Sequence, residues 1–273
     1  MNYDHFIDKR QLRRSFERAA AGYDQAAVLQ HEVCNRMLSR LDYIKYIPDT
    51  LLDAGSGTGY GNRKLVMRYP SVRVIAIDIA MAMHSQARSL IPWWKRLPPF
   101  YKSNINYICG DIEQLPLKDS GIGMVWSNLT LQWCDNIKQT FSEVRRVLKT
   151  DGLFMFSTLG PDTLKEFRQV FSGVDKYRHT NRFTDMHDIG DLLAHNGFST
   201  PVMDMEYITL TYDDVVSAMR DLKAIGAHNI ADGRQRGLTG KNGWRRAVES
   251  YETFRIEGKL PVTFEVIYGH AWK

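Results

Sequence analysis

Between about residues 50 and 157, short apolar runs alternate with segments whose apolar positions recur at helical spacing. Five runs are rich in β-branched or other apolar residues and are bounded by turn residues. They predict strands at 51–54, 72–78, 105–109, 122–126 and 153–157. The crossovers between them are short, so the pattern favours a parallel sheet with helices on both faces.

Further helical patterns cover 11–41, as one or two amphipathic helices, and 136–149, 162–171 and 185–196. Thr184 or Asp185 is predicted to cap the start of the last helix, and Gly197 to end it. The segment 91–100 differs, because its prolines and the pair Trp93-Trp94 exclude a regular helix. We expect an insertion packed on its own domain, with a partner surface or a membrane contact as alternatives.

The composition is that of a globular enzyme. The chain has 273 residues, 44% hydrophobic and 25% charged, which suffices for a sizeable α/β core. No run reaches the roughly 18 apolar residues of a membrane span, and the N-terminus lacks a signal peptide, so we expect a cytoplasmic protein. The three scattered cysteines indicate reduced thiols. The segment 185–188 resembles a helix start more than a metal site, and no metal is expected.

The formal net charge is +5, and its distribution is uneven. Basic residues gather between Lys9 and Arg18 and again between Arg234 and Arg246. Such clusters can attract an acidic partner, although solvated surfaces explain them equally well. Aromatic residues do not interleave with them as in a single-strand groove, so nucleic acid is a disfavoured partner.

A glycine-rich turn follows the first predicted strand, in the segment from Asp53 to Gly59. Its glycines, at 55, 57 and 59, let the backbone turn sharply and approach a ligand closely beside a helix N-terminus. Their spacing matches neither the dinucleotide fingerprint nor the phosphate loop. An acidic residue followed by x-G-x-G-x-G resembles motif I of the class I S-adenosylmethionine-dependent methyltransferases, in which this loop holds the methionine part of the cofactor.

Later strand ends carry matching landmarks. Asp78 ends the second run, where a carboxylate can hold a ribose diol. The segments 110–112 and 127–133 resemble the family's adenine contact and the loop facing the reacting methyl. The resemblance implies S-adenosylmethionine as cofactor, S-adenosylhomocysteine as product, and a cofactor site formed by Asp53, Gly55, Ser56, Gly57, Gly59, Asp78, Ile79, Asp111, Ile112 and Asn128.

Segments on both sides of the predicted core indicate one particular family of methyltransferases. The segments 15–30, 127–133, 185–191, 201–204, 221–227, 237–240 and 268–272 are similar to the malonyl-[acyl-carrier protein] O-methyltransferases of biotin synthesis. Together they cover nearly the whole chain. Ala54 and Ser56 depart from the Leu and Cys of many relatives, and the insertion at 92–99 is a further departure that leaves carrier docking open.

This resemblance implies an α/β fold of the class I methyltransferase type: a Rossmann-like sheet, mainly parallel with an antiparallel C-terminal strand, helices on both faces, and added lid helices. It implies a single domain over 1–273. Its parts are N-terminal lid helices at 1–45, the S-adenosylmethionine-binding core at 46–160, a helical substrate lid at 161–200 and a part completing the sheet at 201–273.

The implied reaction is methyl transfer to the free carboxylate of a malonyl group on acyl carrier protein, which forms the methyl ester that primes pimeloyl synthesis. No stable membrane association is expected. Candidates for positioning the carboxylate are Tyr23, Gln30, Asn128, Gln132 and Trp133, although Tyr23 and Trp133 suit packing equally well. Cations that could bind substrate or carrier are Arg13, Arg14, Arg18, Arg182, Arg220 and Lys223.

Two other functions stay open at this point. A related branch, the mitochondrial complex I assembly factor that hydroxylates an arginine of a partner subunit, shares parts of the C-terminal region. A methyltransferase of a quinone or another small molecule would keep the core without needing the basic flanks. A non-catalytic scaffold is disfavoured, because the cofactor loop and the predicted lid are both present.

Overall fold

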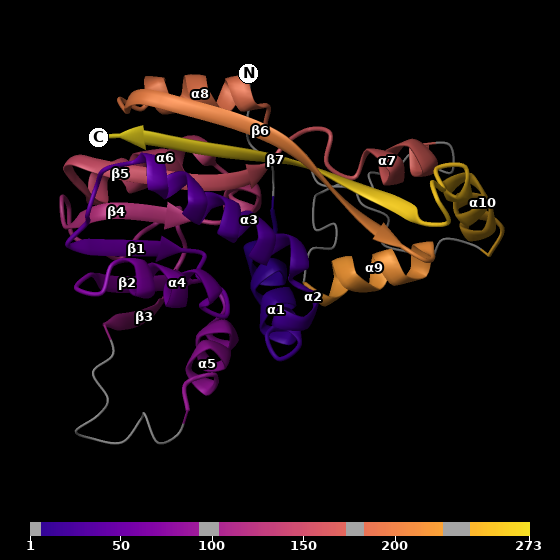
Figure 1. Cartoon of the computed structure of the whole chain (residues 1–273), viewed down its shortest axis with the longest axis horizontal. Coiled ribbons are helices and arrows are strands. Elements are labelled where there is room, and N and C mark those ends of the chain that lie inside the picture. The colour runs from indigo at the N-terminus through magenta and orange to yellow at the C-terminus, as the bar shows by residue number, and fades with distance from the viewer. Residues whose placement is uncertain (1–6, 93–103, 173–182, 226–240) are drawn as a thin grey trace.

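The computed structural model describes residues 7–92, 104–172, 183–225 and 241–273, the last with side chains from residue 243 onward. Within these ranges the centre is a seven-stranded sheet with the strand order β3-β2-β1-β4-β5-β7-β6 (Figure 1). The strands are β1 (Thr50–Ala54), β2 (Arg73–Asp78), β3 (Ile105–Cys109), β4 (Ile122–Ser127), β5 (Leu148–Leu159), β6 (Ser199–Tyr212) and β7 (Leu260–Trp272).

The first five strands are mutually parallel, as the short crossovers predict. The strand order reverses between β1 and β4, which lie side by side although β2 and β3 separate them in sequence. At such a switch point the loops leave the carboxyl ends of neighbouring strands in opposite directions and open a crevice. The glycine-rich turn after β1 and the segment after β4 both enter this crevice.

The last two strands form a long antiparallel ribbon. β7 pairs antiparallel with β5 only from Trp272 back to Val266, whereas its pairing with β6 continues to Leu260. The ribbon therefore extends past the end of β5 and carries a second group of helices beyond the sheet (Figure 1). This arrangement confirms the predicted mixed sheet with its antiparallel C-terminal strand.

The helices around the core are α3 (Val28–Arg40), α4 (Tyr60–Arg68), α5 (Met81–Ser89), α6 (Ile137–Val147) and α8 (Met186–His195). α3 and α4 bury Val33, Met37 and Leu65 against side chains of β1, β4 and β5 on one face of the sheet. α6 and α8 share a cluster around Phe141 on the other face. The sheet is thus covered on both faces, which explains why β1 and β4 are buried throughout and mostly apolar.

Three helices, not one or two, occupy the N-terminal pattern. They are α1 (Lys9–Ala19), α2 (Tyr23–Ala26) and α3, and the chain turns at Gly22 and again at Ala27. Asp8 caps α1 by accepting hydrogen bonds from the backbone N–H groups of residues 10 and 11, each at 3.0 Å. The first break separates α1, which contacts α5, from α3, which lies on the sheet.

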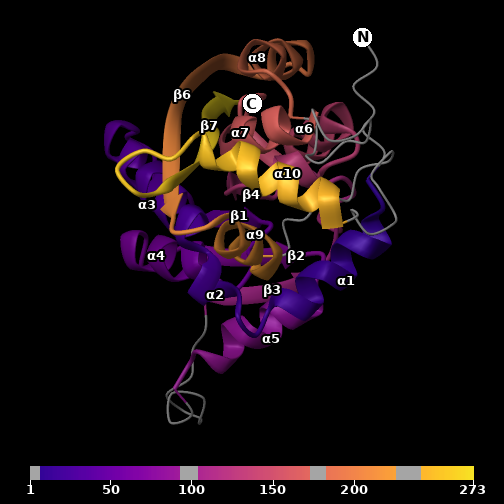
Figure 2. The same cartoon turned by 90° about the vertical axis from the view of Figure 1, so that its right-hand side faces the viewer.

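Helices from three separate segments surround the ribbon: α7 (Lys165–Ser172), α9 (Val215–Ala224) and α10 (Lys241–Glu252) (Figure 2). Of the two helices predicted within 161–200, α7 lies at the ribbon, whereas α8 packs with α6 on the sheet. Asp185 caps α8, and Gly197 follows it with a φ of +80°. The insertion around Trp93 and Trp94 lies outside the described residues.

Candidate active site

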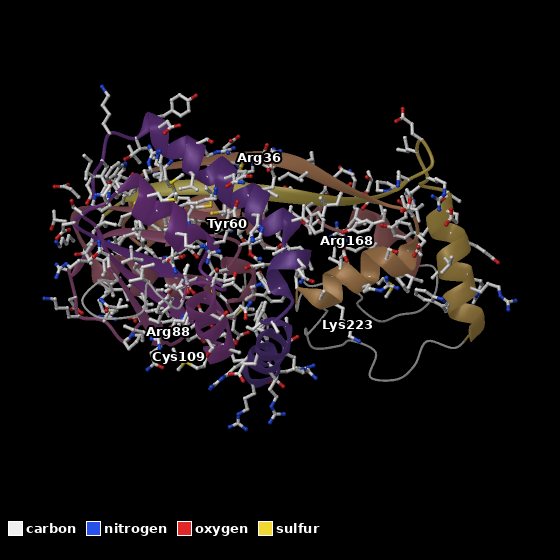
Figure 3. The ribbon with its side chains drawn as sticks, turned by 60° about the horizontal axis from the view of Figure 1, so that its bottom comes forward. Arg36, Tyr60, Arg88, Cys109, Arg168 and Lys223 are labelled. Carbon is white, nitrogen blue, oxygen red and sulfur yellow. The ribbon has the colours of Figure 1, made fainter. Side chains whose placement is uncertain are left out.

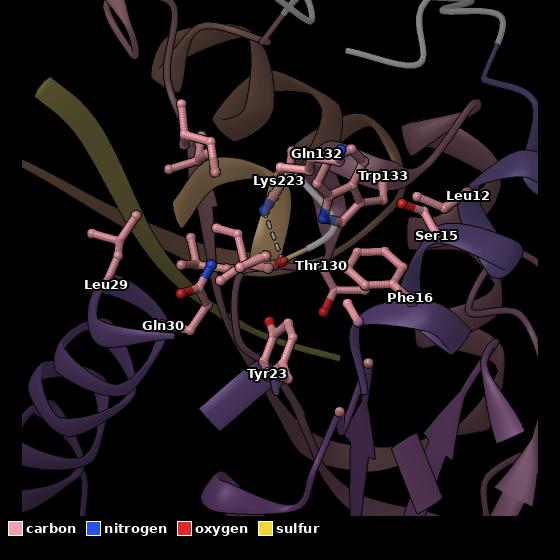
Figure 4. Close-up of a pocket in the computed structure, with 18 of the residues that line it drawn as sticks. Leu12, Ser15, Phe16, Tyr23, Leu29, Gln30, Thr130, Gln132, Trp133 and Lys223 are labelled. Carbon is pink, nitrogen blue, oxygen red and sulfur yellow. Dashed lines mark hydrogen bonds between the residues drawn. The ribbon is translucent and has the colours of Figure 1, made fainter. Parts of the chain in front are cut away.

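A cavity of about 1270 Å³ opens at the carboxyl ends of β1, β2 and β4. Its lining comes from the core loops, from α1 to α3, and from α7, α9 and α10 on the ribbon (Figure 4). Pockets for one small molecule usually measure about 300–1,000 Å³. The volume is therefore sufficient for a nucleoside cofactor together with an acceptor.

The glycine turn forms one wall of this cavity. The backbone N–H groups of Gly55 and Ser56 both donate to the carbonyl of Ile77, at 2.8 and 2.9 Å, which fixes the turn against β2. Gly55 has a φ of +80°, and a Cβ there would lie 2.0 Å from Oγ1 of Thr130. Gly59 also has a positive φ and precedes α4. Only glycine fits at position 55, and its bare backbone faces the cavity.

A buried histidine lies under the same turn. His84, on α5, places Nε2 3.3 Å from Oγ of Ser56. Burial lowers the pKa of His84 to about 4, so the imidazole is neutral at physiological pH. The histidine was not among the predicted site residues, because nothing in the local sequence connects residue 84 with the turn.

Asp78 lies at the end of β2, with its carboxylate held by the backbone. Oδ2 accepts the N–H of Gly57 and Oδ1 accepts that of Ala80, each at 2.9 Å. Burial raises the pKa of Asp78 to about 6, and these two hydrogen bonds oppose the rise. Each carboxylate oxygen has a second lone pair. Asp78 and Ile79 both line the cavity, so the carboxylate can accept further hydrogen bonds from a diol there.

Asp53, like Ser56 and Gly59 of the turn, is a predicted cofactor residue that does not belong to the described lining of the cavity. It is 2% exposed and lies behind the turn, outside the described lining of the cavity. Burial, and then the charge of Asp78, raise the pKa of Asp53 to about 8. The carboxyl group is therefore mostly protonated at neutral pH, and its placement suits support of the turn from behind.

The wild type is expected to lose folding stability as the pH rises towards about 8, and Asp53→Asn is expected to remove this loss. The folded-state pKa of about 8 lies above the ordinary value of 3.8, so the folded state retains a proton that the unfolded state releases. The stability contributed by Asp53 is thus fully present below about pH 4 and is lost as the pH rises towards about 8.

Denaturant unfolding at several pH values measures this effect. Between about pH 5 and pH 8, the free energy of unfolding of the wild type should fall by several kcal/mol relative to Asp53→Asn, because one pKa unit is about 1.4 kcal/mol. Parallel pH profiles for the two proteins would contradict the assignment.

Asp111 follows β3 and forms an ion pair across the cavity. Nζ of Lys9, on α1, lies 3.1 Å from Oδ2 of Asp111 and also contacts Glu113. The backbone N–H of Ile7 donates to Oδ1 of Asp135 at 3.0 Å. α1 is thereby fastened over the end of the cavity where Asp111 and the buried Ile112 lie. The sequence assigned Lys9 only to a basic cluster, and its partners became visible in three dimensions.

The loop after β4 is held by two side-chain amides. Asn128 donates from Nδ2 to the carbonyl of Gln30 at 3.0 Å and accepts the hydroxyl of Ser157 at 2.9 Å. Gln132 donates from Nε2 to the carbonyl of Leu129 at 2.7 Å. These bonds connect the loop to α3 and β5. Both predicted residues thus line the cavity while their amides are partly occupied in shaping it.

The other three predicted positioning residues also line the cavity. Oε1 of Gln30 is buried without a hydrogen-bond partner among the described atoms, so it can accept a bond from a ligand. Burial strongly raises the pKa of Tyr23, which packs beside Met83. Trp133 contacts Phe16 edge to face, with ring centroids 5.6 Å apart. Tyr23 and Trp133 therefore combine packing with exposure to the cavity.

The structure separates the predicted cations into groups. Arg18, Arg220 and Lys223 line the cavity. Arg13 and Arg14 lie exposed on α1, outside its described lining. Arg182 falls outside the described residues.

The wall on the ribbon was predicted only in part, through the lid helix at 162–171 and the candidates Arg220 and Lys223. It includes Phe167 of α7, Val216 and Met219 of α9, Trp244 of α10 and Phe264 of β7. Apolar residues recur every three or four positions in α9, and this spacing indicates an amphipathic helix. Only the long β6–β7 pairing brings that helix to the cavity.

Two broader features are limited to the described part of the chain. Its helices include none that is long and apolar enough to cross a membrane. Across the same residues, no three His, Cys, Asp or Glu side chains gather in a way that could hold a metal ion.

The strand order, the glycine turn and the acidic residues at successive strand ends define a class I S-adenosylmethionine-dependent methyltransferase. A family model described as a methyltransferase domain matches residues 52–156. The crystal structure of a putative methyltransferase from Bacillus halodurans shares the fold, with a TM-score of 0.59 at 20% identity over 86% of this chain and 98% of that one.

Sequence relatives identify the particular family. The chain is 66% identical to a malonyl-[acyl-carrier protein] O-methyltransferase of Nitrosospira multiformis, over 100% of this chain and 92% of the relative. It is 58% identical to that of Gallionella capsiferriformans, over 98% and 91%. The chain belongs to the malonyl-[acyl-carrier protein] O-methyltransferase family, which confirms the resemblance drawn from its sequence.

Proposed function

We propose that this enzyme transfers the methyl group of S-adenosylmethionine to the free carboxylate of malonyl-[acyl-carrier protein]. The products are the malonyl methyl ester that primes pimeloyl synthesis in the biotin pathway and S-adenosylhomocysteine. The observation that carries the proposal is the 66% identity, along the whole chain, with a protein named for this activity. The cavity supports it, because its volume suits both a cofactor and an acyl group.

The cofactor end of the proposed site is the glycine turn with Asp78 and Asp111. Gly55 offers bare backbone to the methionine part, Asp78 can accept the ribose hydroxyls, and Asp111 lies where an adenine amino group would be bound. Gly57, Ile79, Ile112 and Asn128 of the lining complete the proposed set, together with Ser56 and Gly59 of the turn and Asp53 behind it.

The reaction needs alignment more than proton transfer. A carboxylate with a pKa near ~4 is already ionised at neutral pH, so no general base is required. When bound, S-adenosylmethionine supplies an electrophilic methyl group. The loop held by Asn128 and Gln132, together with Gln30 on α3, forms the wall against which the acceptor is oriented. Apolar side chains of the ribbon wall, such as Phe167 and Phe264, limit contact with water, which strengthens interactions between the charged reactants.

The purified protein, S-adenosylmethionine labelled in the methyl group and malonyl-carrier protein test this function directly. Mass spectrometry should show the acyl group heavier by one methylene, with the label in a base-labile ester. Succinyl-carrier protein and a carrier without an acyl group serve as controls. Methylation of free phenols with none of malonyl-carrier protein would replace the proposal with a small-molecule methyltransferase.

Arg13→Glu/Arg14→Glu is expected to raise the KM for carrier-bound malonate by about tenfold at low salt and to leave cofactor affinity unchanged. Both side chains are exposed on α1, where they can attract an acidic carrier protein. Turnover on malonyl-carrier protein should also fall steeply as salt increases in the wild type.

Lys45→Glu/Lys118→Glu provides a matched control for the carrier surface. These exposed lysines precede β1 and β4 and therefore lie toward the opposite edge of the sheet from the cavity. The control should retain the wild-type KM and salt dependence. Equal effects of the two double variants, or wild-type kinetics that ignore salt, would refute a docking role for Arg13 and Arg14.

A further inference from the structure

One face of α9 lines the cavity and is at the same time open to solvent. Val216, Met219, Arg220 and Lys223 all belong to the lining, and all four are exposed. Their spacing of i, i+3, i+4 and i+7 places them on one side of a helix. This surface, here called the α9 face, combines two apolar side chains with two cations at the mouth of the cavity.

The cations of the α9 face differ from the other basic residues of the lining. Lys9 is paired with Asp111 and Glu113, and Nε of Arg18 donates to the carbonyl of Arg14 at 3.2 Å. Within the described part of the chain, neither Arg220 nor Lys223 has a carboxylate within ion-pair distance. As far as the described residues are concerned, both can bind an anion.

Nearby carboxylates are occupied elsewhere. Asp214 caps α9 and accepts hydrogen bonds from the backbone N–H and the hydroxyl of Ser217, at 2.8 and 3.0 Å. These bonds are the main reason that the pKa of Asp214 is lowered, and the charge of Arg220 adds to the effect. Asp221 interacts with Tyr212 on β6. Lys223 lies in the last turn of α9, where the helix dipole favours a cation.

The position of the α9 face fits an extended ligand. α9 contacts α2, which carries Tyr23, so the face leads from the mouth towards the part of the cavity bounded by Gln30 and Thr130 (Figure 4). An acyl thioester on a carrier protein reaches an active site through a phosphopantetheine arm. That arm has a dimethyl group close to a phosphodiester, which carries one negative charge, and this pairing matches the adjacent apolar and cationic residues.

We propose that the α9 face binds the phosphopantetheine arm, with Arg220 and Lys223 binding its phosphate and Val216 and Met219 contacting its dimethyl segment. The inference rests on the proposed function and names how its acyl carrier is recognised. Two cations one helical turn apart can each donate to an oxygen of the phosphodiester anion, and charge-assisted hydrogen bonds to phosphate are stronger than neutral ones. The α9 face would therefore bind the phosphopantetheine arm, which is common to all acyl carrier proteins. Other residues would contact the surface of the carrier protein itself.

The test compares two small substrates, malonyl-phosphopantetheine and malonyl-pantetheine, which differ only in the phosphate. In the wild type, kcat/KM should be at least about tenfold higher with the phosphorylated substrate. In Arg220→Gln/Lys223→Gln this preference should fall to about twofold or less. Calorimetry should show unchanged affinity for S-adenosylhomocysteine, which separates loss of the contact from loss of the fold.

A matched control is available on α7. Lys165 and Arg168 are also three residues apart on a helix of the ribbon, but they lie outside the described lining of the cavity (Figure 3). Arg168 is 4.0 Å from Asp162, and the ammonium of Lys165 lies over the ring of Tyr207. Lys165→Gln/Arg168→Gln should keep the wild-type preference for the phosphorylated substrate.

Each other outcome overturns the inference in a distinct way. Equal loss on both substrates in Arg220→Gln/Lys223→Gln would assign the cations to the malonyl carboxylate. A loss confined to malonyl-carrier protein would assign them to the carrier surface. A wild type without preference would show that the phosphate is not bound. Failure of the wild type to methylate any malonyl thioester would instead refute the proposed function.

Discussion

Gly55→Ala is expected to abolish measurable binding of S-adenosylmethionine and S-adenosylhomocysteine. The added Cβ would lie 2.0 Å from Oγ1 and 2.5 Å from Cγ2 of Thr130, far inside contact distance, and the φ of +80° disfavours any side chain. Thr130 follows the short β4 loop that Asn128 fastens, so it cannot withdraw without moving that wall. The glycine turn must therefore shift, and the bare backbone surface is lost.

Two control substitutions, Gly57→Ala and Gly22→Ala, distinguish the effect of steric collision from that of backbone strain. Gly57 has a φ of +51°, but a Cβ added there would have nothing within 4 Å, so its replacement should cost about 1–2 kcal/mol of strain without a collision. Gly22 lies outside the turn, also in open space, and should tolerate alanine. In calorimetric titration, the affinity for S-adenosylhomocysteine should be highest for Gly22→Ala, lower for Gly57→Ala and lowest for Gly55→Ala. Affinity of Gly55→Ala within threefold of the wild type would disprove the close approach at this position.

Asp78→Asn is expected to weaken cofactor binding by about ten- to a hundredfold, because hydrogen bonds to a charged group contribute about 1.5–3 kcal/mol. Asparagine has one acceptor oxygen in place of two. The backbone N–H groups of Gly57 and Ala80 donate to different oxygens of the Asp78 carboxylate, so both oxygens are needed as acceptors. An amide nitrogen would face one of these donors, so both the turn and the ribose contact would suffer.

The pH dependence of binding provides an independent check on Asp78. Burial raises its pKa to about 6, so the carboxylate is ionised above that pH and becomes protonated below it. Cofactor affinity of the wild type should therefore fall as the pH drops from about 7 to below about 6, whereas Asp78→Asn should lack this decline. His84 titrates lower, with a pKa of about 4, and should not contribute in this range. A wild-type affinity that stays flat down to about pH 5 would contradict the role of Asp78.

Local sequence patterns were sufficient for the parallel half of the fold. The runs that end at Ala54, Asp78 and Cys109 form β1, β2 and β3, because short β-branched and apolar runs bounded by turn residues favour strands. The spacing of the glycines at 55, 57 and 59 likewise reflects a backbone requirement, and all three have positive φ. Such features depend on residues close in the chain, so the sequence displays them directly.

The tertiary structure decided which side chains share the cavity. Lys9 and Asp111 are 102 residues apart, and α9 reaches the cavity only because β6 and β7 pair beyond the end of β5. The placement of Asp53 behind the turn and the orphaned oxygen of Gln30 arise in the same way, from packing between distant segments. The sequence by itself determined the methyltransferase family, the parallel core and the turn, since these follow from local backbone and burial requirements. The lid contacts, the ribbon wall and the pKa shifts were decided by the tertiary structure, because proximity and desolvation exist only once the whole chain has packed.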